Sequence, residues 1–117
     1  RRSAPAIVGV EVLAGRIRKG YPLITRKGRR IGEIMQIQEH KKPLEEAVRG
    51  QAVAISIRGR VIIGRQVKEG DVLYVDVPLE HITILLEEFA DQLSEEEVEI
   101  LKRIRLLRMG LAEELPP

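Results

Sequence analysis

The sequence predicts a mainly β domain, folded as a closed Greek-key-like β-barrel, that is followed by two C-terminal α-helices. Up to about residue 76, short runs rich in Val and Ile are separated by Gly and by basic pairs, which is typical of strands and turns. Residues 34–38 and 52–58 alternate almost strictly between apolar and polar side chains, which indicates strands with one wet face. After Pro78 the apolar period becomes that of a helix. Closure into a barrel is expected because it removes exposed strand edges.

The expected strands occupy residues 6–13, 21–25, 30–38, 51–58 and 71–76, with residues 60–64 as a further candidate. Glycines between these segments are expected to form the turns. We therefore predict a β-barrel over residues 1–77 and a helical extension over residues 78–117, packed on or beside the barrel. The chain starts without Met on a strand-like segment, which suggests a fragment of a longer multidomain factor.

The first predicted helix carries an apolar stripe made by Ile82, Leu85, Leu86, Phe89 and Leu93. The second begins at Ser94, where Ser94 and Glu97 have the spacing of a capping box, and Gly110 is its expected stop. The apolar face of the second helix is broad. It either packs on the first helix and the barrel or receives another protein, and the sequence leaves both interpretations open.

Charge is divided unequally along the chain. Residues 1–70 contain 16 Lys or Arg against 6 Asp or Glu, a net charge near +10. Residues 71–117 contain 4 against 12, a net charge near −8. Such asymmetry indicates an anionic partner, such as nucleic acid, for the basic part.

The basic residues form sets at the ends of predicted hairpins, where long side chains remain solvated. These sets are Arg16, Arg18 and Lys19; Arg26, Lys27, Arg29 and Arg30; and His40, Lys41 and Lys42, with Arg49 nearby. Only Tyr21, Tyr74 and Phe89 are aromatic, which disfavours a site that stacks single-stranded bases. Recognition of the RNA backbone, of the shape of the RNA or of a chain terminus is favoured instead.

Catalytic and metal-binding patterns are scarce. The chain has no Cys, and neither His40 nor His81 has a metal-type spacing with another ligand, so no metal is expected. Residues 59–66 have the glycine spacing of a phosphate-binding P-loop, but Arg65 and Gln66 stand where that motif needs Lys and Ser or Thr. We therefore predict no enzymatic activity and no cofactor in this domain, and a small hydrolase is the remote alternative.

No apolar run approaches the ~20 residues that span a bilayer, and no signal peptide follows Arg1. We expect a cytoplasmic protein that is monomeric and makes no membrane contact. The absence of Asn and Trp and the abundance of Arg, Glu, Ile and Val favour a thermophilic source.

Several segments resemble a known family. Residues 15–20 (GRIRKG), 34–38 (IMQIQ), 47–55 (AVRGQAVAI) and 67–73 (VKEGDVL) resemble the second-domain barrel of translational GTPases such as elongation factor Tu. Their order, joined to residues 5–12 and 93–97, is similar to domain IV, the C-terminal domain of archaeal and eukaryotic translation initiation factor 5B. The similarity covers nearly the whole chain.

This resemblance implies a barrel of six to eight strands followed by two α-helices. It also implies contact with the aminoacylated acceptor end of initiator methionyl-tRNA on the ribosome, and docking of translation initiation factor 1A on the terminal helices. GTP and Mg would then belong to an upstream domain of the full-length factor.

The resemblance places the candidate acceptor-end site on two loops. Its residues are Gln38, Glu39, His40, Lys41, Lys42, Arg49, Gly50, Gln51, Ala52 and Val53. The residue types differ from those of the bacterial factor, so ordinary exposed basic turns remain an alternative. The candidate partner site on the second helix has Ile100, Ile104 and Leu107 as a pocket and Arg103, Arg105 and Arg108 as charge partners.

A second functional class is a protein-interaction module that binds a partner through its helices, while its basic barrel only faces the ribosome. The two classes predict different responses. A tRNA-binding domain responds to tRNA, whereas a protein-interaction module responds to its partner in the helices and not to tRNA.

Overall fold

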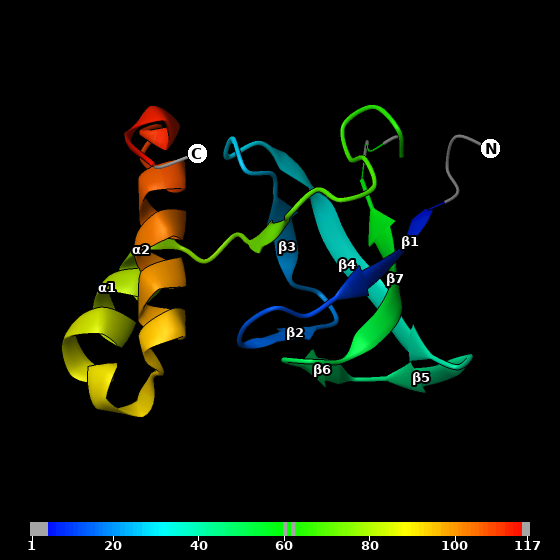
Figure 1. Cartoon of the computed structure of the whole chain (residues 1–117), viewed down its shortest axis with the longest axis horizontal. Helices are drawn as coiled ribbons and strands as arrows, with labels where there is room; N and C mark the ends of the chain where they lie inside the picture. The colour runs from blue at the N-terminus through cyan, green and yellow to red at the C-terminus, as the bar shows by residue number, and fades with distance from the viewer. Residues whose placement is uncertain (1–4, 60, 62, 116–117) are drawn as a thin grey trace.

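The computed structural model describes residues 5–59, 61 and 63–115. The β-rich part comes first and the helices follow (Figure 1). The elements are β1 (Ala6–Glu11), β2 (Arg16–Arg18), β3 (Pro22–Ile24), β4 (Arg30–Glu39), β5 (Lys42–Leu44), β6 (Glu46–Val48), β7 (Ala52–Arg58), β8 (Tyr74–Val75), α1 (Leu79–Glu88), the short 3₁₀ helix η1 (Ala90–Gln92), α2 (Glu95–Arg108) and η2 (Ala112–Glu114).

The strands form one curved antiparallel sheet in the order β1-β7-β4-β3-β8, and β5 extends it by pairing with the end of β4. β1 and β7 pair over their whole common length, from Ala6 opposite Ile57 to Glu11 opposite Ala52. β2 and β6 form a separate two-stranded ribbon, which lies across the lower opening of the curved sheet in Figure 1.

The prediction of a mainly β domain followed by two C-terminal helices is confirmed. Within the described residues, no hydrogen-bonded ladder joins β1 to β8, so the ladders do not form a complete ring. The reason lies between β7 and β8, where the described residues make only an isolated bridge between Ile63 and Val67. The candidate strand at 60–64 falls partly outside the described residues.

Three short strands, β2, β5 and β6, were not expected from the sequence. Each has only three residues, too few for an alternating pattern to be recognised. The strand expected at 71–76 is reduced to the two residues of β8.

The core of the β-domain is an aliphatic cluster in which the inward side chains of β4 and β7 meet. Ile34, Ile37, Ile55 and Ile57 are buried there, and Ala47 of β6 is fully covered. β3 contributes to two cores, and residues on both of its faces are buried. Leu23 points into this cluster, whereas Ile24 belongs to a second cluster with the helices. Since side chains alternate along a strand, β3 separates the two cores.

The second cluster holds the helices against the β-domain. Ile24 is 2% exposed, and it packs with Ile82 of α1 and with Leu101, Ile104 and Leu107 of α2. Tyr74 and Val77, from β8 and the segment after it, also pack there, so the chain entering α1 contributes to the same core.

Both ends of α2 are defined by local sequence. Ser94 Oγ accepts a hydrogen bond from Glu97 N, and Glu97 Oε1 accepts one from Ser94 N, which completes the predicted capping box. At the other end Gly110 has φ of 76°, the Gly110 N–H donates to Leu107 O and the Leu111 N–H donates to Leu106 O. This is a Schellman motif, and the predicted stop at Gly110 is confirmed.

Candidate nucleic-acid interface

The first predicted RNA-binding loop is the tip of the β4–β5 hairpin. Glu39 and Lys42 are paired, so His40 and Lys41 form a two-residue turn. Their φ angles are 52° and 67°, the left-handed conformation that a type I′ hairpin turn requires at both positions. Asn and Gly usually occupy these positions, and a residue with a bulky side chain costs about 1–2 kcal/mol there. The turn therefore presents an imidazole and an ammonium group at an energetic cost.

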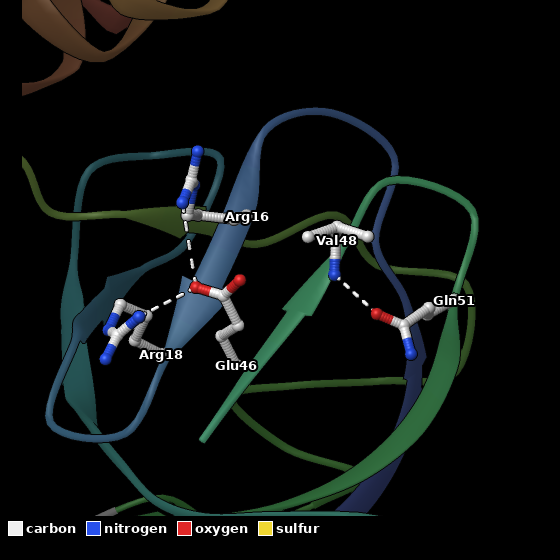
Figure 2. A network of polar contacts seen from close by, with 5 residues as sticks. All are labelled: Arg16, Arg18, Glu46, Val48 and Gln51. Atoms are coloured by element: carbon white, nitrogen blue, oxygen red, sulfur yellow. Dashed lines mark hydrogen bonds and ion pairs between the residues drawn. The ribbon is translucent and has the colours of Figure 1, made fainter. Parts of the chain in front are cut away.

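The second loop is the turn between β6 and β7. The Gln51 N–H donates to Val48 O. The Val48 N–H donates to Gln51 Oε1, as Figure 2 shows. The Gly50 N–H donates to Val12 O, and the Arg49 N–H donates to Gly15 O at 3.0 Å. Gly50 has φ of 94°, and no atom lies within 4 Å of where its Cβ would stand. The turn is fixed by its backbone, and it is open on the side of Gly50.

The structure does not bring the two loops together on one rim. β5 and β6 follow each other along the lower edge of the domain, with the β4–β5 turn at one end and the β6–β7 turn at the other (Figure 1). The β6–β7 turn points toward the helices, and Arg49 Nε lies 3.1 Å from Glu96 Oε1 of α2. Arg49 is therefore paired with a carboxylate.

The remaining residues of the predicted acceptor-end site are divided between surface and core. Gln38 and Ala52 are exposed, and Glu39 and Gln51 are half-buried. Val53 is 5% exposed and packs in the core of the β-domain. The expectation that Val53 contacts RNA is therefore wrong, because alternation along β7 turns its side chain inward.

Acidic residues neutralise much of the basic charge near the β2–β6 ribbon. Arg18 Nη1 lies 2.7 Å and Arg16 Nη1 3.6 Å from the same Oε1 of Glu46, as Figure 2 shows. Lys19 Nζ lies 4.0 Å from Glu45 Oε2. In contrast, no ion pair is found for Lys41 or Lys42 within the described part of the chain. The cations near the predicted acceptor-end site that make no ion pair with a described residue are therefore Lys41 and Lys42 of the β4–β5 hairpin.

The predicted pocket on α2 is not open. Ile104 is 3% and Leu107 is 4% exposed, and Ile100 packs against the same cluster. The interpretation of this face as a pocket for another protein is wrong, and the alternative of packing on α1 and the β-domain is confirmed. The cause is Ile24, which comes from the outer face of β3 and covers this stripe.

The three arginines at the end of α2 have different surroundings. Arg108 forms an ion pair with Asp76, whose side chain is 10% exposed and also lies 3.5 Å from Arg30 Nη1. Arg108 is therefore part of the joint between α2 and the β-domain. Arg103 and Arg105 are half-buried, and neither makes an ion pair with another described residue.

A cleft lies between the β-domain and the start of α2. Its volume is about 440 Å³, and it is lined by Gly15, Arg16, Val48, Arg49, Ser94, Glu96 and Glu97. Its walls carry opposite charges, because the arginines belong to the β-domain and the glutamates belong to the helix. No local pattern predicts the contact between Arg49 and Glu96, which are 47 positions apart.

Within residues 5–59, 61 and 63–115, no three His, Cys, Asp or Glu side chains come together in an arrangement that would hold a metal ion. In the same residues no helix combines the length and apolar character needed to cross a membrane.

The fold is a curved β-domain with a helical pair packed on β3. A family model described as elongation factor Tu domain 4 matches residues 1–74, and the chain belongs to this family. The resemblance to translation factors in the sequence is thereby confirmed.

Relatives of high identity are initiation factors. A probable translation initiation factor IF-2 of Caldivirga maquilingensis is 56% identical over 108 residues, which are 92% of this chain and 18% of that protein. The corresponding factor of Methanopyrus kandleri is 59% identical over 104 residues, 89% of this chain and 17% of that protein. The crystal structure of GDP-bound aIF5B from Aeropyrum pernix matches with a TM-score of 0.86 and 50% identity, over 97% of this chain and 19% of that one. This chain thus spans under a fifth of each relative.

Replacing Ile104 by Ala should lower the free energy of unfolding by about 2–5 kcal/mol, because the change leaves a cavity in the core between α2 and β3. Ile84→Ala on α1 is the matched control, since Ile84 is 45% exposed, and it should change stability by less than about 1 kcal/mol. Urea denaturation followed by circular dichroism measures both. Equal effects of the two substitutions would contradict the burial of Ile104.

The double substitution His40→Asn and Lys41→Gly should raise the free energy of unfolding by about 1 kcal/mol, because Asn-Gly accepts the type I′ turn with less strain. Lys102→Gly, in the exposed part of α2, is the control, and it should destabilise the fold by about 1 kcal/mol. Thermal and urea unfolding give both values. A loss of stability in the hairpin variant would mean that the turn is not strained.

Proposed function

We propose that this chain is a tRNA- and factor-binding domain of a translation initiation factor and that it contacts the aminoacylated acceptor end of initiator methionyl-tRNA. The observation that carries the proposal is the β4–β5 turn, where His40 and Lys41 both have positive φ and are exposed. Strained backbone at a turn is maintained where it serves a function. The initiation-factor relatives support the choice of partner.

The chemistry of the turn suits a phosphate-rich RNA end. Lys41 and Lys42 are exposed cations free of ion pairs with the described carboxylates, and they adjoin Gln38, whose amide is exposed. Lys supplies charge to phosphates, and the amide and imidazole supply hydrogen bonds to sugar or base edges. Ala52, the first residue of β7, is small and exposed and offers little steric hindrance. The site binds and positions RNA, and it catalyses nothing.

In the full-length factor, GTP and its metal ion would be bound outside this chain, and the factor would act in the cytoplasm on the ribosome. We further propose that the helical pair docks translation initiation factor 1A. With Ile104 and Leu107 buried, the available contacts on the helices are Arg103 and Arg105 of α2 and the exposed apolar side chains Ile84 and Phe89 on or next to α1. An acidic tail with apolar side chains would match this combination.

Removing the charges of the β4–β5 hairpin should weaken tRNA binding. Lys41→Gln with Lys42→Gln is expected to lower the affinity for initiator methionyl-tRNA several-fold and to reduce the salt dependence, because two phosphate contacts are lost. Arg65→Gln with Lys68→Gln removes the same charge from another exposed loop and serves as the control. Fluorescence anisotropy between roughly 50 and 200 mM salt measures both.

Equal losses in the two variants would show only a general electrostatic effect and would remove the hairpin from the proposal. Deacylated tRNA is the second comparison, since recognition of the esterified amino acid requires that it bind less tightly. Titration of methyl-labelled protein with factor 1A distinguishes the proposed function from the alternative, a protein-interaction module. The alternative predicts that factor 1A shifts methyl signals in the helices and that tRNA shifts none.

Breaking the ion pair between Arg49 and Glu96 should strengthen RNA binding. Glu96→Gln frees Arg49 for phosphate and removes a negative charge beside it, so the affinity for tRNA should rise by about two- to fivefold. Glu95→Gln makes the same charge change one residue earlier and is the matched control. If both variants gain equally in the anisotropy assay, the specific effect of Glu96 is refuted.

A further inference from the structure

The β3–β4 turn, residues 25–29, carries three cations that the proposed tRNA site does not use. Arg26, Lys27 and Arg29 are exposed, and none of them makes an ion pair with another described residue. The turn lies at the upper end of the β-domain in Figure 1, whereas the β4–β5 turn lies at the lower end. The two cationic turns are therefore separate surfaces.

The backbone of the β3–β4 turn is held in place by its own hydrogen bonds. Thr25 Oγ1 accepts from the N–H groups of Lys27 and Arg29, both at 3.2 Å. The Thr25 N–H donates to Arg29 O, and the Gly28 N–H donates to Thr25 O. Such a turn presents its cations from a fixed backbone, which lowers the entropy lost on binding.

The turn is also fixed against α2. Gly28 has φ of 84°, and a Cβ there would stand 2.9 Å from the carbonyl oxygen of Leu107. The turn therefore lies against the carboxyl end of α2, and Figure 1 shows the two at the same end of the molecule. The only described carboxylate that pairs with cations at this joint is Asp76, and Arg30 and Arg108 both already contact it.

Counting charges at this joint gives a clear surplus. Five cations are present against Asp76 at the joint and Glu113 and Glu114 in η2 just after α2, and the helix end adds only about half a negative charge. The cations are Arg26, Lys27, Arg29, Arg30 and Arg108. The β2–β6 ribbon, in contrast, balances Arg16, Arg18 and Lys19 with Glu45 and Glu46.

We propose that the β3–β4 turn, together with the adjoining end of α2, is a second RNA-contact surface that binds the phosphate backbone of structured RNA. A cluster of arginines can also bind an acidic peptide, but the other two features that dock peptides, a free strand edge and an apolar pocket, are not found in the described residues of this turn. β3 is paired on both edges, with β4 and β8. No exposed large apolar side chain lies in residues 25–29, and the exposed Met109 and Leu111 stand just after α2, outside the turn. Phosphates need only exposed, correctly spaced cations.

This second surface is distinct from the proposed acceptor-end site, because it binds backbone phosphates and does not require a free RNA end. A domain with cationic turns at both ends contacts two RNA elements at once, the tRNA end at the β4–β5 turn and a helical RNA at the β3–β4 turn. Binding by phosphates alone is independent of sequence and strongly dependent on salt.

The test uses this chain and an RNA hairpin of about 16 base pairs that has no single-stranded end. Arg26→Gln, Lys27→Gln and Arg29→Gln together should lower the affinity for the hairpin about tenfold or more at ~0.1 M salt and reduce the salt slope by about 2–3. The control is Arg16→Gln, Arg18→Gln and Lys19→Gln, which removes three cations already paired with carboxylates. It should change the affinity much less. Unfolding curves verify that both variants remain folded.

Amide chemical-shift mapping with the same RNA hairpin is an independent measurement. The largest shift changes are expected at Gly28 and its neighbours rather than at His40. The proposal is overturned if the two triple variants lose affinity equally, or if the Arg26, Lys27 and Arg29 variant binds like the wild type. It is also overturned if that variant loses binding to poly-glutamate but not to RNA, which would indicate a protein partner.

Failure of the acceptor-end proposal has a different signature. In that case, the wild-type protein would bind the hairpin with an added aminoacylated single-stranded end no more tightly than the blunt hairpin. This result does not depend on whether the β3–β4 turn binds RNA. The variant with Lys41→Gln and Lys42→Gln should abolish that increase and leave the binding of the blunt hairpin largely intact.

Discussion

The burial of Ile24 among the helices determines how the rest of the molecule is arranged. β3 places Leu23 in the core of the β-domain and Ile24 in the helical cluster, so two cores share one strand. Because α2 packs on Ile24, its amino end meets the β6–β7 turn and its carboxyl end meets the β3–β4 turn. Docking of the helix therefore pairs Arg49 with Glu96, whereas the cations of β2 pair within the β-domain itself.

The distribution of charge follows from this docking. The acidic first turn of α2 completes the capping box and also supplies Glu96 to Arg49. One sequence segment thus serves helix stability and local neutralisation. Asp76 has a comparable dual role, since it contacts both Arg30 and Arg108 and ties the start of β4 to the end of α2. Cations that make no ion pair with a described residue include those of two turns, one at each end of the domain.

The two turns present their cations by different physical means. The β3–β4 turn uses a Thr hydroxyl and a glycine at positive φ, so its geometry is relaxed. The β4–β5 turn places His40 and Lys41 in conformations that favour Asn and Gly, so its geometry is strained. Strained backbone is concentrated at functional sites, and this is the ground for the acceptor-end proposal, whereas the second proposal rests on exposed cations alone.

Local patterns in the sequence determined the class of fold, the two helices with the caps at Ser94 and Gly110, the longer strands and the excess of basic charge in the first 70 residues. These features depend on neighbours a few positions apart, which a sequence displays directly. Only the tertiary structure decided that Ile104 and Leu107 are core residues, that Val53 points inward and that Arg49 is paired. The physical reason is that each depends on a contact between segments distant in sequence, and an apolar stripe or a cation looks the same whether or not a partner covers it.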